Sequence, residues 1–344
     1  MNSEQLQNWL TEISEKFRGY EEKITQQKIS TPNYQRRLEE IGVETQYLIS
    51  YLMNNYENVQ LIQPVIAQIL SIYFKLGIGR FFVLQLIPSL MHTYLLGIAK
   101  RQKQSISMLE TFFMAVYNEE ILAGGPSCEQ MNKKVEEIRV PSIRYPSIYH
   151  DPSKFNPYPE ITQMRPNGGT TVQNIVRIGP FSAVDRINAE NRAVVLTRIL
   201  KSVNEALCYM CRDIVCRSYC ISMLILAKGG FSYPESGYRV KVLQNKASDE
   251  EYGDQSKKPR IPLTSFFLME ALNGIHYSIF NGYADIGLRA LDAVHNRAQY
   301  ELYGDVLLIT NALHDSLQQN QSIRMMLEIE PGILRQQKKT AAET

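Results

Sequence analysis

The sequence predicts a mainly α-helical protein, an antiparallel helical bundle of αα-hairpins with a short β-hairpin and two long polar loops. Apolar residues recur every three or four positions through most of the 344-residue chain, which is the period of an amphipathic helix. Two segments break this pattern. Residues 141–180 hold seven of the fifteen prolines, and residues 228–260 are polar and charged with no apolar period. Helices that are joined by short turns pack as antiparallel neighbours, so a bundle is expected.

The composition is that of an ordinary globular protein. The chain has 37 basic and 35 acidic side chains, a formal net charge of +2, and 44% apolar residues. These values exclude the collagen-like, wholly disordered and disulfide-stapled classes. We expect no nucleic-acid partner, because phosphate binding needs a clustered basic surface. The N-terminus shows no secretory signal, and four of the five cysteines lie within 13 residues, which favours a reducing compartment.

The first 125 residues are predicted to form helices, and Gly77 and Gly79 are expected to end the helix that precedes them. Residues 81–99 are the segment most similar to a membrane span. A spanning helix needs about 20 mostly apolar residues, and this one has polar or helix-breaking side chains at five positions. We therefore expect no direct membrane span, but a core helix that bends or restarts at Pro88. The five side chains are Gln85, Pro88, Ser89, His92 and Thr93.

The predicted organisation is a single helical domain over residues 1–318, followed by a flexible tail at 319–344. β-Branched residues at 135–140 and 172–178 are expected to pair as a short β-hairpin around a long insertion. The two long loops are expected at about 141–180 and 228–260.

Residues 196–214 predict one long amphipathic helix, because their apolar residues recur in steps of 4, 3, 4, 3 and 4. A helix cap is expected at residues 182–185. Four cysteines lie in or just after this helix, and at 100° per residue their side chains point in different directions. We therefore expect no metal site and regard them as small core residues. They are Cys208, Cys211, Cys216 and Cys220.

The C-terminal part predicts three helices joined by short turns. Thr264 or Ser265 is expected to cap the first, Asn281-Gly282 to end it, and Gly304-Asp305 to precede a last helix over 306–317. The first two resemble one tetratricopeptide unit. No second copy follows at the 34-residue period of that repeat, and an array needs at least about three units.

No motif predicts catalysis or a cofactor, because phosphate-binding glycine loops and kinase signatures are absent from the sequence. One alternative is a small hydrolase that uses His150 and Asp151, although no nucleophile or oxyanion hole accompanies them locally. Another alternative is a helix-turn-helix nucleic-acid binder around residues 264–302. Its recognition helix would carry Arg289, His295 and Arg297, which is too little charge for tight phosphate neutralisation.

Several runs of residues resemble the hyccin family and occur in the order that the family has. The two longest are residues 140–153, which end in Tyr149-His150-Asp151-Pro152-Ser153, and Arg297-Ala298-Gln299-Tyr300-Glu301-Leu302-Tyr303. Agreement of both by chance is not expected. Shorter runs are Val116-Tyr117-Asn118-Glu119-Glu120-Ile121, Ala189-Glu190-Asn191-Arg192, Arg260-Ile261-Pro262, Gly274-Ile275-His276-Tyr277, Phe280-Asn281-Gly282, Ala290-Leu291-Asp292 and Asn311-Ala312.

This resemblance implies a non-enzymatic, mostly helical scaffold of the cytosol that reaches the plasma membrane peripherally, through partners. Hyccin-type proteins associate with a large tetratricopeptide-repeat scaffold protein. That pair and a lipid-anchored membrane adaptor bring phosphatidylinositol 4-kinase type III alpha to the plasma membrane, where the kinase makes phosphatidylinositol 4-phosphate. The chain departs from the family at residues 19–33, at the acidic 247–256 segment, and in its short tail after 318. Animal members of the family often carry a long tail there, which helps to contact the adaptor.

The two longest runs supply the predicted partner-binding residues. Tyr149, His150, Asp151 and Pro152 come from the first run, and Arg297, Tyr300 and Tyr303 from the second. The alternative for both runs is an intramolecular role. In that case the loop pins two helical halves together, and Tyr300, Leu302 and Tyr303 belong to the core.

Overall fold

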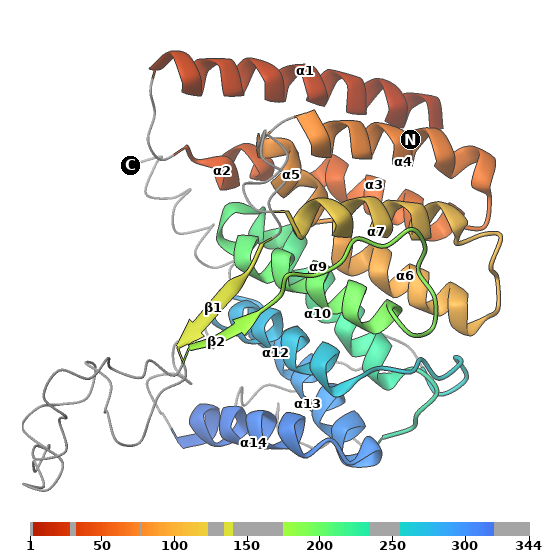
Figure 1. The fold of residues 1–344 in the computed structure, drawn as a ribbon, viewed down its shortest axis with the longest axis vertical. Helices are drawn as coiled ribbons and strands as arrows, with labels where there is room; N and C mark the ends of the chain where they lie inside the picture. Colours follow the sequence, from red (N-terminus) through yellow and green to blue (C-terminus); the bar gives the residue numbers. More distant parts are fainter. Residues whose placement is uncertain are drawn as a thin grey trace, which may run out of the picture. The chain divides into compact units, whose positions relative to one another are not determined.

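The computed structural model describes residues 3–27, 32–75, 77–122, 134–139, 175–233 and 255–319. Most of them are helical, and one small antiparallel sheet is present, which confirms the mainly α class (Figure 1). The chain divides into two compact units. One comprises Met1–Tyr117 with Val184–Thr344, and the other is Asn118–Ala183. The helices are α1 (Ser3–Gln27), α2 (Tyr34–Glu39), α3 (Gly42–Asn55), α4 (Val59–Lys75), α5 (Gly77–Leu84), α6 (Ile87–Ala99), α7 (Ser107–Glu120), α9 (Arg192–Ala206), α10 (Arg212–Lys228), α12 (Ser265–Phe280), α13 (Ala284–Glu301) and α14 (Gly304–Gln319).

The smaller unit contains the predicted β-hairpin. Strand β1 (Glu136–Arg139) pairs antiparallel with β2 (Ile175–Ile178), and Ile138 lies opposite Val176. The directly opposed pair Glu137 and Arg177 also forms an ion pair of 2.8 Å. Opposite charges at facing positions stabilise an antiparallel register, so this part of the prediction is confirmed. The insertion between the strands lies outside the described residues.

Aromatic and aliphatic side chains pack α1 onto the rest of the larger unit. Its buried residues Leu6, Leu10, Ile13 and Phe17 repeat at helical spacing. The Phe17 ring meets the Phe82 ring of α5 edge-on at 5.7 Å between centroids. Aromatic rings prefer such edge-to-face geometry in addition to the apolar area that they bury.

The prediction that Gly77 and Gly79 end a helix is wrong in detail, because both begin the next one. Helix α4 stops at Lys75 and α5 starts at Gly77. A Cβ on Gly79 would lie 2.4 Å from the carbonyl oxygen of Ile72. Glycine is needed here because the two backbones approach too closely for any side chain.

The restart at Pro88 is confirmed. Helices α5 and α6 meet at a bend of 47°, and Pro88 lies in the first turn of α6, where its missing N–H is harmless. Ten of the thirteen residues of α6 are buried, and the helix packs against α3, α9 and α10. Among the described residues no single helix is long and apolar enough to cross a membrane. The bent α5–α6 pair satisfies the length and composition of a span.

The predicted long helix at 196–214 is wrong. Helix α9 ends at Ala206, a 3-10 turn covers Leu207–Tyr209, and α10 starts at Arg212. The cause is tertiary, because the backbone N–H of Cys211 donates to Oε1 of Gln85 at 3.3 Å and not to the helix. The predicted cap at 182–185 is also wrong, since α9 begins at Arg192. The turn before it is closed by Asn188 and Asn191, whose side chains each accept from the other's backbone N–H.

The three C-terminal helices agree with the prediction. The hydroxyl of Thr264 accepts from the backbone N–H of Phe267 at 3.3 Å and caps α12. Asn281 ends α12, and Gly282 takes the left-handed conformation that turns the chain into α13. Helix α13 packs on α10 and α12, and α14 packs on α12 and α13 at the edge of the helical unit (Figure 1).

Candidate interaction surface at the end of helix α13

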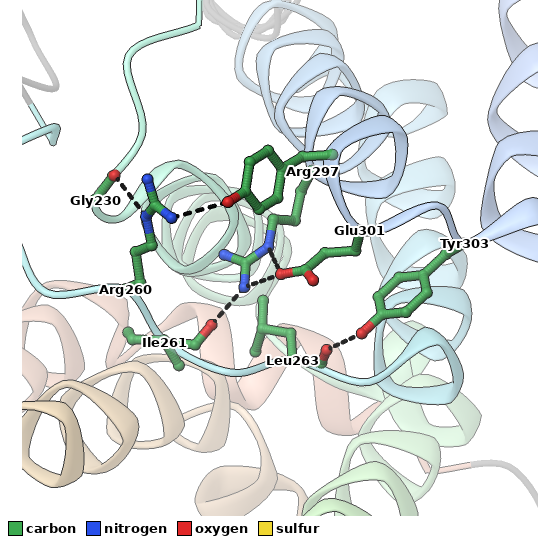
Figure 2. Close-up of polar contacts among 8 residues, drawn as sticks. Gly230, Arg260, Ile261, Leu263, Arg297, Glu301 and Tyr303 are labelled. Carbon is green, nitrogen blue, oxygen red and sulfur yellow. Dashed lines mark hydrogen bonds and ion pairs between the residues drawn. The ribbon is translucent and has the colours of Figure 1, made fainter.

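Arg297 joins the end of α13 to the segment that leads into α12. It lies on the α13 face toward this segment, and it is 2% exposed. Its Nη2 donates to the carbonyl oxygen of Ile261 at 2.7 Å, and its Nε donates to Glu301 Oε1 at 2.9 Å (Figure 2). A buried guanidinium is costly unless its charge is paired and its donors are bonded; here Nε and Nη2 are bonded, and Nη1 has no hydrogen-bond partner among the described residues. This contact therefore fixes where the 260–264 segment crosses α13.

A ring that the sequence did not single out occupies the centre of this region. Phe231 follows the end of α10, and the guanidinium carbons of Arg260 and Arg297 lie 4.4 and 4.6 Å from its ring centroid. The Tyr233 ring stacks on it at 5.1 Å, and the Tyr300 ring meets it edge-on at 4.8 Å. The negative face of an aromatic ring attracts a cation. Phe231 thus holds both arginines in place.

Arg260 and Tyr300 form the outer layer of the same cluster. Arg260 Nη1 donates to the hydroxyl of Tyr300 at 2.9 Å. Its Nε donates to the carbonyl oxygen of Gly230 at 3.2 Å (Figure 2). Tyr300 remains 54% exposed. A half-exposed tyrosine held by an arginine presents a large, rigid contact area, and such side chains are frequent in protein interfaces.

Tyr303 has an internal role. Its hydroxyl donates to the carbonyl oxygen of Leu263 at 2.8 Å, so it attaches the start of α12 to the end of α13 (Figure 2). Burial, and next the charge of Glu301, raise the pKa of this phenol. Between Tyr300 and Tyr303, Leu302 is 84% exposed, so the alternative that placed it in the core is wrong.

The structure brings Arg297, Tyr300 and Tyr303 together, as their spacing on one helix end requires. Tyr149, His150, Asp151 and Pro152 lie outside the described residues, and so do the two residues of the hydrolase alternative, His150 and Asp151.

The sequence analysis did not identify Phe231, because this residue follows Gly229-Gly230 at the start of a polar insertion. An aromatic pair, Phe231 and Tyr233, directly after that helix stop was the available signal.

The structure does not favour the helix-turn-helix alternative. The Arg289 side chain is 10% exposed and pairs with Asp285 at 3.2 Å, and Arg297 is buried. His295 Nδ1 lies 2.8 Å from the hydroxyl of Thr310 on α14. All three side chains that would contact phosphates are therefore engaged inside the chain.

Three of the four expected core cysteines, Cys211, Cys216 and Cys220, are buried, whereas Cys208 is exposed, so the expectation is wrong for that residue. Because the long helix is broken, Cys208 lies in the 3-10 turn and Cys211 directly precedes α10. Burial raises the pKa of Cys216 and of Cys220 to about 12, so both thiols remain protonated at neutral pH. In the part of the chain that the structure describes, no group of three or more His, Cys, Asp or Glu side chains could hold a metal ion.

Two runs of the resemblance meet in this region: Arg260-Ile261-Pro262 and the α13 end from Arg297 to Tyr303 contact each other through two hydrogen bonds, of 2.9 and 2.7 Å. The comparison with protein families agrees with this resemblance. The family model described as Hyccin matches residues 32–341, which is nearly the whole chain. The chain therefore belongs to the hyccin family.

Proposed function

We propose that this protein is a non-catalytic, stabilising scaffold subunit that binds a tetratricopeptide-repeat scaffold protein. Through that partner it helps to recruit phosphatidylinositol 4-kinase type III alpha to the plasma membrane and supports phosphatidylinositol 4-phosphate synthesis. The observation that carries the proposal is the match of the Hyccin model to residues 32–341. Membership in this family supports, in general terms, a role as a subunit of that kinase's complex.

The fold is consistent with such a role. Helices with large exposed side chains at their ends are suited to packing against other helices. At the end of α13, the exposed face of Tyr300 stands on a rigid base of Phe231, Arg260 and Arg297. We take Tyr300 as the partner-facing member of the three α13 residues, because Arg297 and Tyr303 are bonded internally.

The proposed location follows from the proposed partners. The formal charge of +2 provides no strong basic field for an anionic membrane. A subunit of this kind reaches the plasma membrane peripherally from the cytosol, through the repeat scaffold and a lipid-anchored membrane adaptor.

Co-expression tests the proposal directly. The full chain, tagged, is produced with and without the repeat scaffold, and soluble yield and recovery of the kinase are measured. We expect the scaffold to increase the yield and the kinase to be retained with the pair. Recovery of a folded chain that retains neither protein would contradict the proposal.

Two variants localise the contact. Tyr300→Ala is expected to lower the affinity for the scaffold about tenfold, as removal of an interface tyrosine commonly does. Tyr47→Ala is the matched control, because Tyr47 on α3 is similarly exposed. A combined alanine variant of Tyr149, His150, Asp151 and Pro152 tests the other predicted contact.

A further inference from the structure

The outward face of α14 is apolar in its middle and acidic at both ends. Leu308 is 73% exposed, and Ile309 and Ala312 beside it are also exposed. Positions three, four and seven apart share one helix face, so Asp305 lies at the start of this stripe and Asp315 at its end. The opposite face carries the buried residues Val306, Thr310 and Leu317. We call the exposed side chains of Leu302, Leu308, Ile309 and Ala312 the α14 stripe.

Contacts with α13 fix which side of α14 faces outward. The hydroxyl of Thr310 lies 2.8 Å from Nδ1 of His295, and Nε2 of His314 lies 3.4 Å from Asp292 Oδ1. Both contacts come from the inward face of α14. The helix is therefore attached in one rotation, and Leu308 and Ile309 remain exposed.

Leu302 is unusual in a second respect. It ends α13 in the left-handed conformation, with φ 59° and ψ 39°, and its N–H and that of Tyr303 both point to the carbonyl oxygen of Ala298. Glycine is the usual residue at such a helix end, because a Cβ is strained there. Neither chain folding nor solubility favours an exposed leucine at this position. A residue that is unfavourable on both counts suggests a functional role.

Charge specifies what would cover the stripe. Between Gly304 and Gln319 the chain has no lysine or arginine, while Asp305 and Asp315 are exposed. An apolar stripe with acidic ends is complementary to an apolar stripe that is flanked by basic side chains. A helix with that pattern can lie along α14 with its leucine-type side chains between those of the α14 stripe.

We propose that the α14 stripe is a docking surface for a basic amphipathic helix of another protein. The contact is formed by Leu302, Leu308 and Ile309, and Asp305 and Asp315 pair with lysine or arginine at its edges. This surface goes beyond the role in a kinase complex and does not depend on it, so either proposal can fail alone.

Fluorescence anisotropy with the full chain tests this surface. The probe is a labelled synthetic helix of about 20 residues, long enough to be helical, with leucine every three or four positions and lysine beside them. A second probe has glutamate in place of lysine. We expect the lysine probe to bind, with an affinity that falls as salt rises, and the glutamate probe to bind at least about tenfold more weakly.

Leu308→Gln is the decisive variant, because glutamine forms helices nearly as well as leucine and the site is exposed. It should weaken the lysine probe about tenfold, and Asp305→Asn with Asp315→Asn should reduce the salt dependence. Val43→Gln is the matched control at an equally exposed apolar position on α3, and it should change nothing.

Three results would overturn the proposal. The first is equal binding of the lysine probe to Leu308→Gln and to the unchanged chain. The second is equal binding of the two probes, which would indicate unspecific apolar contact. The third is a homodimer in sedimentation that Leu308→Gln converts to monomers while no probe binds, which would make a second copy the occupant.

Discussion

Gly274 on α12 lies against the ring of Tyr219 on α10 so closely that a Cβ would be 2.2 Å from Cζ of that ring. Tyr219 is fully buried, so its ring has no space to move. Gly274-Ile275-His276-Tyr277 is one of the runs that resemble the hyccin family. The structure gives a physical reason for its first residue, which is the close approach of α12 to α10.

Gly274→Ala should lower the free energy of unfolding by about 3 kcal/mol, because overpacking a rigid core forces the helices apart. Urea unfolding followed by circular dichroism measures this change. Gly304→Ala is the control, since nothing lies within 4 Å of a Cβ there, and it should leave the stability nearly unchanged. Equal effects of the two substitutions would show that α12 and α10 are not in close contact.

Arg297→Met should lower the free energy of unfolding by about 3 kcal/mol. Methionine retains much of the stem, but it leaves the carbonyl oxygen of Ile261 without its donor and removes a cation from the face of Phe231. Arg297→Lys should recover only part of this loss, because an ammonium cannot reproduce the planar fork that reaches Ile261 and Glu301.

The loss of unfolding free energy in Tyr300→Phe is the reference against which the loss in Arg297→Met is compared. Tyr300→Phe removes only the exposed hydrogen bond with Arg260, so the expected loss is below about 1 kcal/mol. The midpoints of urea unfolding for these variants separate an internal role of Arg297 from an interface role. If Arg297→Met unfolds at the same urea concentration as the unchanged chain, the internal role is refuted.

Leu302→Gly should stabilise the folded chain by up to about 1 kcal/mol, because glycine has no Cβ to strain in the left-handed conformation. The same variant should weaken binding of the lysine probe to the α14 stripe. Thermal unfolding and anisotropy on one preparation measure the two effects. Leu302→Ala separates them, since alanine retains the backbone strain and loses most of the apolar contact.

His92 should make the protein less stable in acid. Burial, and next the charge of Lys258, lower its pKa from 6.5 to about 4. In the unfolded chain the imidazole takes up a proton below about pH 6.5, whereas in the folded chain it remains neutral until about pH 4. This contribution to stability is therefore fully present above pH 6.5 and decreases as the pH falls. The loss near pH 4 is about 3 kcal/mol.

His92→Leu tests this expectation. Within the described residues neither ring nitrogen of His92 has a hydrogen-bond partner, so leucine leaves no buried group unpaired. The variant should flatten the dependence of unfolding free energy on pH between 6.5 and 4. His276→Gln is the comparison: burial lowers the pKa of His276 as well, but its side chain is largely exposed, so this variant should flatten the dependence less than His92→Leu does. An unchanged slope in His92→Leu would assign the acid sensitivity to other groups.

Local patterns predicted those elements whose ends are set by their own residues. Thr264 caps α12 and Asn281-Gly282 ends it, as their hydrogen-bonding and backbone preferences require. The restart at Pro88 is of the same kind. The break between α9 and α10 could not be predicted, because Gln85, 126 positions away in the chain, accepts the N–H of Cys211. The apolar pattern of residues 196–214 continues across this break, so the sequence does not show that the helix ends there.

The sequence alone determined the helical class, the C-terminal hairpins and the family to which this chain belongs, since periodicity, caps and runs of residues are local information. Only the tertiary structure decided that Arg297 is buried and that Tyr300 is half exposed. Three residues apart on one helix, they differ because Ile261 and Phe231 cover the first and leave the second half exposed. Burial depends on which segments meet in space, and the spacing of residues along one helix does not contain that information.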